Sequence, residues 1–413
     1  MASSDMEPGS QRPTATPMQH TVRRNGIGLF LLLIGSVPLL HFYWHGLRGN
    51  AAPIVATGAQ VPWPHFGRAI LSNAAWRAWK EAIEQHLRED TPVTWELRGR
   101  YNELRYRLGI LQNPQIRVGK DGWLFMRHSL APTAELLAQR AERRREIMAA
   151  VKRRADELGV ALVVLLVPDK ERIYPEFAYP DGAMPAAKSG LYGTILAELR
   201  AAGLTAVDTA APLLAAKSGG ELLFLRGDSH WSGRGALVYG DAVARSLEQG
   251  AFAPLLGPTV NLDLPQPTRV DVVGDLLGMC GMRSYVRPGA DGEFAISLPG
   301  SPLLQELMET KEYYGLSVLA ADGARIPIKT LGASAAIALA GSSFSQGNGA
   351  AAVTFFLHRP VDDRGVHSGA SAFRGLREVF DRLRDGTGKA RLVLWEFVER
   401  AVLEDDWLKA PPF

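Results

Sequence analysis

Three polar side chains in two distant stretches have the types and spacing of a nucleophilic triad. Asp228 and His230 stand one residue apart after the apolar run 222–225, and a helical pattern begins at Ala236. In such a pair the carboxylate fixes the tautomer of the imidazole, and the imidazole takes a proton from a hydroxyl. We interpret the run as a buried strand with the pair at its C-terminal end, where ligands collect in α/β sheets. The alternative is a surface loop with an incidental Asp and His.

The hydroxyl that this base would activate is predicted at Ser343. The apolar run 335–340 is followed by Gly341-Ser342-Ser343-Phe344-Ser345-Gln346-Gly347. A strand that breaks into Gly-Ser-Ser can expose a hydroxyl at a tight turn, where backbone N–H groups can face a developing oxyanion. A common Ser/Gly turn without a catalytic role is the alternative. Together the two stretches supply a nucleophile, a base and a carboxylate.

The composition is that of an ordinary globular protein. The chain has 413 residues, of which 46% are hydrophobic and 22% charged, and this suits one large or two modest domains. The net charge is only +3 and there is no basic stripe with interleaved aromatics, so nucleic acid is not an expected partner. A single cysteine, Cys280, excludes an intrachain disulfide, and no Cys/His cluster predicts a metal site.

The N-terminal region predicts export of the chain and a membrane anchor. Residues 1–24 are polar and end in two arginines, which predicts a disordered cytoplasmic tail. Residues 25–45 are nearly all apolar and, at about 1.5 Å of rise per residue, just span a hydrocarbon core. A cleaved signal peptide with small residues near Ala51 is the alternative, and both interpretations place the rest of the chain outside the cytoplasm. Residues 46–115 predict a linker and a helical juxtamembrane region.

From residue 116 onward strands and helices alternate, which predicts a doubly wound, mostly parallel α/β sheet. Residues 116–126 predict a hairpin, and the unbroken apolar run 160–167 is typical of a central parallel strand. Residues 250–335, rich in Pro, Gly and Asp, predict an insertion of short strands and loops. Other strands are expected at 205–207, 335–340 and 391–397, and helices at 134–158, 191–202, 211–217, 236–248 and 373–383.

Several stretches follow one another in the order known from one family. They are 118–125, 167–170 with Tyr174-Pro175, 226–231, 341–345, and 395–397 with Glu399-Arg400. The chain resembles the membrane-anchored or periplasmic alginate O-acetyltransferases of the AlgJ/AlgX type, which have an SGNH-hydrolase-like domain. The resemblance implies Ser343 as nucleophile, His230 as base and Asp228 as its partner. The motif order is permuted, because ordinary SGNH hydrolases have the serine first and Asp-x-x-His spacing.

The resemblance also implies how the rest of the site and chain are arranged. The N–H of Ser343 is the expected first oxyanion donor, and Gly369, Gln346 and Asn348 are candidates for the second donor or for substrate binding. Residues 116–413 would be the O-acetyltransferase domain, interrupted by the insertion. Glu396, Glu399 and Arg400 at the end of the last strand admit a simpler interpretation as a local salt bridge, which is worth little if exposed.

The activity implied by the family is acetyl transfer through an acetyl-serine to hydroxyls of an exported polysaccharide, alginate-like or cellulose-like. No cofactor and no metal are expected. A membrane-bound acyltransferase is the expected partner that supplies the acetyl group. The chain would cross the bacterial inner membrane once, with its catalytic domain in the periplasm. The alternatives are a polysaccharide acetyl esterase with the same triad, and a non-catalytic scaffold of a secretion complex.

Overall fold

The structure, a computed structural model, describes most of the chain after residue 91. The described residues are 92–263, 266–282, 287–288, 294–295, 306–320, 322, 324–365 and 372–409. The predicted tail 1–24 and anchor 25–45, with most of the region 46–115, lie outside them. None of the helices within the described ranges combines the length and the apolar character needed to cross a membrane.

The chain divides into two compact units. They are Met1–Tyr101 with Ser284–Ser297, and Asn102–Arg283 with Leu298–Phe413. In the first unit the structure describes the beginning of α3 (Pro92–Arg107) and the antiparallel pair of β7 (Arg287–Pro288) and β8 (Phe294–Ala295). The second unit holds the main sheet and all the site residues discussed below.

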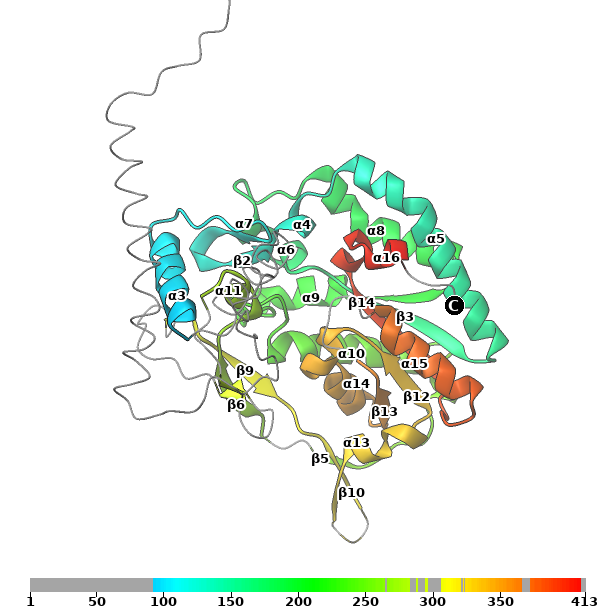
Figure 1. The fold of residues 1–413 in the computed structure, drawn as a ribbon. Coiled ribbons are helices and arrows are strands. Elements are labelled where there is room, and N and C mark those ends of the chain that lie inside the picture. The colour runs from blue at the N-terminus through cyan, green and yellow to red at the C-terminus, as the bar shows by residue number, and fades with distance from the viewer. Residues whose placement is uncertain are drawn as a thin grey trace, which may run out of the picture. The chain divides into compact units, whose positions relative to one another are not determined.

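The second unit is built on a five-stranded sheet in the order β13-β12-β14-β3-β4 (Figure 1). All four neighbouring pairs are parallel, so the predicted parallel sheet is confirmed. The inner strands β3 and β14 are buried along almost their whole length, as their unbroken apolar sequences predict for strands covered on both faces. The strands are β3 (Ala161–Val167), β4 (Thr205–Asp208), β12 (Ile337–Ala340), β13 (Val361–Asp363) and β14 (Leu392–Val398).

Helices cover both faces of this sheet (Figure 1). On one face lie α5 (Ala134–Glu157), α8 (Ala186–Ala201) and α15 (Ala372–Arg384); on the other lie α9 (Ala210–Ala216), α10 (Gly233–Glu248) and α14 (Ala350–Leu357). α5 packs on α8, and α10 packs on both α9 and α14. Glycine at 240 allows the close approach of α10 to α14, because a Cβ there would lie 2.6 Å from the Ala352 backbone.

Shorter elements connect the main strands and helices. The predicted hairpin is confirmed as β1 (Ile116–Val118) paired antiparallel with β2 (Leu124–Met126). The short helices are η2 (Lys120–Gly122), α4 (Arg127–Leu130), α6 (Lys170–Ile173), α7 (Pro175–Ala178), η3 (Lys217–Gly219), η4 (Ala253–Leu255), α11 (Asp275–Met279), α13 (Ile328–Leu331), η5 (Gly332–Ser334), η6 (Ser345–Gly349), η8 (Glu399–Leu403) and α16 (Asp406–Lys409).

Among the described residues of 250–335, two small antiparallel sheets belong to the second unit, besides the β7–β8 pair of the first. β5 (Leu262–Asp263), β10 (Ser317–Leu319) and β11 (Arg325–Pro327) form one, and β6 (Thr268–Val272) pairs with β9 (Glu309–Tyr313) in the other. A separate apolar cluster packs this segment against the β1–β2 hairpin. Its buried members are Ile116, Leu124, Val273, Leu276, Leu277, Cys280 and Met282.

The prediction of a strand at 222–225 is wrong. These residues belong to no sheet and make only the isolated antiparallel bridge between Phe224 and Trp231. The N–H of Leu225 donates to the carbonyl of His230, so the backbone of this run is satisfied partly inside its own loop. An apolar run indicates burial, and burial alone does not distinguish a strand from a packed loop.

Candidate active site

The predicted nucleophile stands just beyond the C-terminal end of β12. Gly341 and Ser342 turn the chain, and Ser343 begins a helical segment that widens into the π-helical turn η6 before α14. Glycine is required at 341, because a Cβ there would lie 2.5 Å from the Ser345 Oγ. π-Helical turns inside helices often occur at functional sites. The turn leaves the Ser343 side chain half-buried at the carboxyl edge of the sheet.

The neighbouring Ser342 fixes this turn to the adjacent strand. Its hydroxyl donates to Oε1 of Glu396 on β14 at 2.6 Å and accepts the N–H of Phe344 at 3.2 Å. Glu396 is fully buried, and burial raises the pKa of its carboxyl to about 7. Its second oxygen, Oε2, is without a hydrogen-bond partner among the described residues. Ser342 therefore has a structural bond, which leaves Ser343 as the hydroxyl that faces the base.

The structure brings the three predicted triad residues together. The Nε2 of His230 lies 2.7 Å from Oγ of Ser343, and the Nδ1 of His230 lies 2.6 Å from Oδ1 of Asp228. Oδ1 of Asp228 also accepts the backbone N–H of His230 at 2.9 Å. Burial alone would raise the pKa of Asp228, but the hydrogen bond and charge of His230 hold it well below its usual range. An ionised carboxylate, an imidazole and a hydroxyl thus stand in the order that general-base activation requires.

One aromatic ring packs beside the imidazole of His230. The ring of Phe344 lies 4.9 Å from it, and Trp231 packs edge-on against Phe344 at 4.9 Å. Phe344 and Trp231 are both almost fully buried. The imidazole therefore has an apolar neighbour that is itself fixed by packing.

A buried lysine supports the loop that carries the base. The Nζ of Lys170, at the start of α6, donates to the carbonyl oxygens of Leu124 at 2.8 Å, Arg226 at 2.7 Å and Asp228 at 3.0 Å. The side chain is only 2% exposed, and burial lowers the pKa of Lys170 to about 7. Nearby acidic groups oppose this shift, and Glu309 opposes it most. All three ammonium donors are used. They tie the loop that carries Asp228 and His230, called the base loop below, to the β1–β2 hairpin.

A buried ionic cluster lies behind Lys170 at the carboxyl ends of β3 and β14. Lys188 contacts the carboxylates of Asp169, Glu171 and Glu399. Arg400 bonds Asp169 at 3.0 Å, and Asp169 and Glu399 are fully buried. The interpretation of Glu399 and Arg400 as an exposed local salt bridge is therefore wrong: their partners lie more than 200 positions away in the chain, and apolar periodicity cannot show such contacts.

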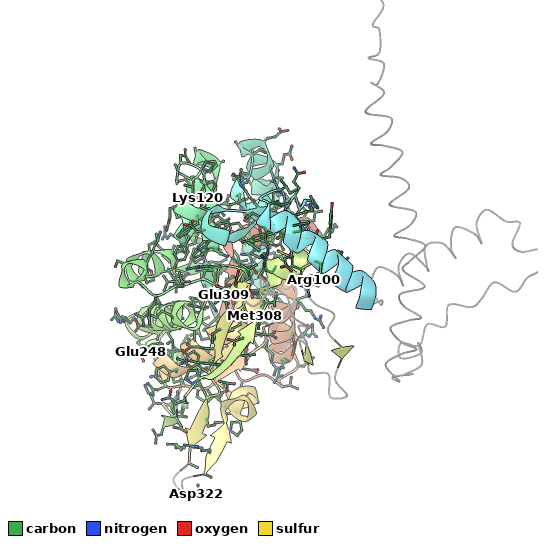
Figure 2. The ribbon with its side chains drawn as sticks, turned by 90° about the vertical axis from the view of Figure 1, so that its left-hand side faces the viewer. Arg100, Lys120, Glu248, Met308, Glu309 and Asp322 are labelled. Carbon is green, nitrogen blue, oxygen red and sulfur yellow. The ribbon has the colours of Figure 1, made fainter. Side chains whose placement is uncertain are left out.

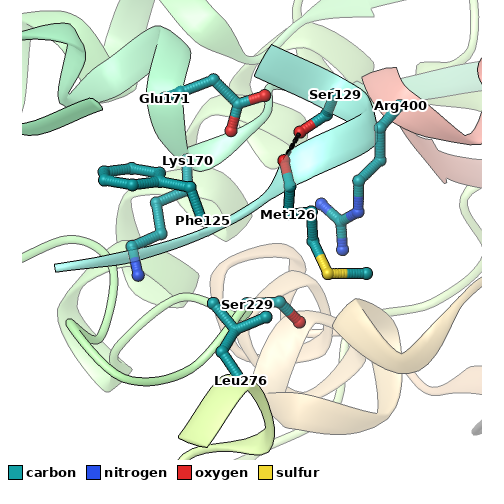
Figure 3. A pocket seen from close by; sticks show the side chains of 8 residues that line it. All are labelled: Phe125, Met126, Ser129, Lys170, Glu171, Ser229, Leu276 and Arg400. Atoms are coloured by element: carbon teal, nitrogen blue, oxygen red, sulfur yellow. Dashed lines mark hydrogen bonds between the residues drawn. The ribbon is translucent and has the colours of Figure 1, made fainter. Parts of the chain in front are cut away.

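A small pocket lies between the base loop and this cluster (Figure 3). The space of about 190 Å³ between its walls includes the open solvent at its mouth, so the enclosed part is much smaller. Figure 3 shows Lys170 and Ser229 on one side and Arg400 on the other, with the Ser129 hydroxyl donating to the carbonyl of Met126. The lining side chains are Phe125, Met126, Ser129, Lys170, Glu171, Ser229, Leu276 and Arg400.

The candidates for the second oxyanion donor lie in different settings. Gly369 falls outside the described residues. Gln346 is exposed, and its side-chain N–H donates to the carbonyl of Gly365. Asn348 is buried with a φ of 81°; its amide accepts the N–H of Tyr314 at 3.3 Å and donates to the carbonyl of Glu312. The amide of Asn348 therefore ties η6 to β9, and the oxyanion roles stay predictions.

A second carboxylate stands beside the predicted pair. Oδ2 of Asp275 lies 3.6 Å from Nδ1 of His230, and burial together with the charge of Asp228 raises the pKa of Asp275. The ligand atoms of Asp228, His230 and Asp275 lie within 4.8 Å of one another, close enough to hold a metal ion. In the present geometry Nδ1 of His230 and Oδ1 of Asp228 are hydrogen-bonded to each other. A metal ion bound by these atoms would have to replace that hydrogen bond.

Sequence reasoning missed the side chains that hold the triad in place. Lys170 follows a central strand, which is a signal of position at the functional edge. Glu396 lies in the stretch 395–397, one of those that resemble the family, but the sequence suggested only an ion pair for it. Asp275 and Glu309 lie in the segment 250–335, where no motif distinguishes them from other acidic residues.

The chain is similar to known proteins over much of its length. A family model described as the SGNH hydrolase-like domain of acetyltransferase AlgX matches residues 116–399. A probable alginate O-acetylase AlgJ of Pseudomonas fluorescens is 27% identical over 299 residues, which are 71% of this chain and 65% of that protein. The corresponding protein of Pseudomonas aeruginosa is 31% identical over 232 residues, 56% of this chain and 53% of that protein.

The matches therefore span less than two thirds of either relative's length. Among solved structures, the O-acetyltransferase domain of Pseudomonas putida AlgJ aligns with a TM-score of 0.55 at 23% identity, covering 72% of this chain and 96% of that chain. This likeness shows a shared SGNH-hydrolase-like α/β fold.

Proposed function

We propose that this chain, which belongs to the family of AlgX acetyltransferases with an SGNH hydrolase-like domain, transfers acetyl groups to hydroxyls of an exported polysaccharide. Its relatives carry the name probable alginate O-acetylase, so alginate is the proposed acceptor. The observation that carries the proposal is the hydrogen-bonded relay from Asp228 through His230 to Ser343.

The first half of the reaction forms an acetyl-serine. Oγ of Ser343 attacks the acetyl carbonyl while its proton passes to Nε2 of His230, and Asp228 stabilises the imidazolium that results. The N–H of Ser343, at the start of its helical segment, is the first donor to the oxyanion. When the intermediate collapses, the bond to the leaving group breaks and the leaving group takes the proton from His230.

The second half transfers the acetyl group to the acceptor. A sugar hydroxyl gives its proton to His230 and attacks the acetyl carbonyl of the modified Ser343. Collapse of the second intermediate breaks the Ser343–acetyl bond and returns the proton to Oγ. Protons move only among Ser343, His230, the leaving group and the acceptor hydroxyl, so the proposed steps need no cofactor.

The proposed setting is the bacterial periplasm. Residues 116–413 form the catalytic domain, interrupted at 250–335, and residues 25–45 anchor it to the inner membrane. A membrane-bound acyltransferase delivers the acetyl group, because the periplasm is outside the cytoplasmic pool of activated acetyl donors. The apolar run 25–45, preceded by two arginines, supports this setting.

The test uses the full chain, an activated acetyl ester as donor and mass spectrometry of the peptide that holds Ser343. We expect that peptide to gain the mass of one acetyl group and to lose it when an alginate oligosaccharide is added. Ser343→Ala should abolish the gain, and Ser218→Ala, at an exposed serine, should leave it unchanged. A wild-type chain that never acquires the acetyl group would overturn the proposal.

The same experiment distinguishes transfer from hydrolysis. Transfer predicts that the acceptor becomes acetylated while release of free acetate falls. An acetyl esterase would release acetate at the same rate with and without the oligosaccharide, and that result would replace the proposed function.

A further inference from the structure

The loop that carries the proposed base is held by residues of the segment 250–335. Glu309 at the start of β9, labelled in Figure 2, accepts the backbone N–H of Arg226 at 2.5 Å through Oε1 and that of Gly227 at 2.7 Å through Oε2. One carboxylate thus binds two consecutive N–H groups. Arg226 and Gly227 belong to no strand, so no β-ladder supplies partners for these N–H groups.

Asp275 holds the next part of the same loop. Its Oδ1 accepts the N–H of Ser229 at 2.6 Å, and its Oδ2 accepts the Ser229 hydroxyl at 2.5 Å. The backbone N–H of Asp275 donates in turn to Oδ2 of Asp228 at 3.3 Å. Asp275 therefore orients both the residue before His230 and the carboxylate that binds its Nδ1.

The backbones of the two segments also meet closely. The N–H of Leu277 donates to the carbonyl of Gly227 at 3.3 Å. A Cβ at Gly274 would lie 2.1 Å from that carbonyl oxygen and 2.7 Å from the backbone nitrogen of Asp228. Position 274 has no space for a side chain, so the segment is fitted to the base loop at this point.

Charge is distributed in a complementary way across the loop. Its N–H groups at 226, 227 and 229 face the carboxylates of Glu309 and Asp275, and its carbonyls at 226 and 228 face the ammonium of Lys170. Hydrogen bonds with one ionised partner are about twice as strong as neutral ones. The loop is therefore held between opposite charges in place of a β-ladder.

We propose that Glu309 and Asp275 are positioning residues that keep His230 within hydrogen-bond reach of Ser343, so that β9 and α11, which carry them, are a working part of the active site. The identity of the reaction rests on the proposed function above. The positioning role concerns only the geometry of Ser343, His230 and Asp228, so it can be tested without an acetyl donor.

The first variant is Glu309→Gln in the full chain. The amide keeps one oxygen for two N–H groups and turns its own NH₂ toward a backbone donor, so the bonds to Arg226 and Gly227 cannot both survive. We expect kcat on an activated acetyl ester to fall about 10- to 100-fold with little change in KM, as for other residues that orient a reacting side chain. Glu306→Gln, an exposed acid of the same segment, is the matched control and should change neither.

The second readout is the sulfonylation of Ser343 by phenylmethanesulfonyl fluoride. In this reaction the Ser343 oxygen bonds to sulfur, the sulfur–fluorine bond breaks, fluoride leaves and the proton passes to His230. The rate reports how well His230 activates the hydroxyl. It should fall by the same factor as kcat in Glu309→Gln and in Asp275→Asn, and hydrogen–deuterium exchange should rise in the peptide that spans 222–232.

The outcomes separate positioning from a general structural role. Slower sulfonylation with faster local exchange, at an unchanged global unfolding midpoint, supports the proposal. Unchanged sulfonylation in both variants overturns it, and so does a loss of rate that follows global unfolding without faster exchange at 222–232. If wild-type Ser343 is sulfonylated but never acetylated, the proposed function fails while the positioning role stands.

Discussion

Ser343 and His230 meet at one point, but different kinds of structure hold them there. Ser343 follows β12 directly, and a buried Ser342–Glu396 bond joins its turn to β14. His230 lies on a loop outside the main sheet, held by Lys170, Glu309 and Asp275. Ser343 thus depends on the main sheet, and His230 depends on a set of charged side chains. Changes to the carboxylates that hold the His230 loop should therefore reduce activity with little unfolding, a change at the buried Lys170 should affect both, and changes at Glu396 should mainly alter stability.

The largest effect is expected from removing either end of the relay. Ser343→Ala and His230→Ala should each lower kcat on an activated acetyl ester by about 10⁶-fold, because the two side chains act as one unit. The double variant should be no slower than either single one. A double variant whose loss equals the product of the two single losses would show that the residues act separately. That result would contradict the view that Ser343 and His230 form one site.

The next largest effect is expected at the carboxylate. Asp228→Asn keeps an acceptor for the backbone N–H of His230 but favours the wrong imidazole tautomer, so kcat should fall by about 10⁴-fold. The unfolding midpoint should stay close to that of the wild type, because the other loop bonds remain. A rate loss below about tenfold would indicate that Asp275 takes over the role of Asp228.

A mixed effect on activity and stability is expected at the buried lysine. Lys170→Met leaves three buried carbonyl oxygens without their donor, at a cost of about 1–3 kcal/mol for each unsatisfied group, and releases the base loop. Denaturant unfolding and ester turnover measure the two losses. Lys120→Met is the control, since Lys120 is exposed and donates to a single carbonyl, that of Pro180. Equal effects of both variants would contradict a special role for Lys170.

The smallest effect on turnover is expected at Glu396, which binds the hydroxyl of Ser342 beside Ser343. Burial raises the pKa of this carboxyl from 4.5 to about 7 in the folded protein, so the folded state binds its proton more tightly than the unfolded state does. The stability from this group is complete below pH 4.5 and is lost as the pH rises to about 7, by on the order of 3 kcal/mol at most.

Glu396→Gln should remove this titration. Relative to the wild type, the variant should gain stability between pH 5 and pH 8 as measured by denaturant unfolding, because a neutral amide replaces a carboxyl that would otherwise ionise while buried. Glu142→Gln, at an exposed position, should give no such trend. An unfolding free energy that rises with pH more steeply in the wild type than in Glu396→Gln would contradict the assignment.

The same contrast explains what the sequence could predict. Unbroken apolar runs identified β3, β12 and β14, and the Gly-Ser-Ser break after one of them indicated Ser343, because a strand and its edge are local features. The spacing of Asp228 and His230 indicated a base, but the strand assigned to them was wrong. Their loop is held by contacts with Lys170, Asp275 and Glu309, which lie between about 45 and 85 positions away in the chain, and no local pattern records such contacts.

The hydrogen bond between His230 and Ser343 joins positions 113 residues apart. A growing polypeptide that has not yet reached position 343 holds the imidazole but has no hydroxyl to place beside it. The contact is non-local, and contacts of this kind slow folding. The Ser343–His230 pair can therefore form only after synthesis has passed position 343 and the chain has folded.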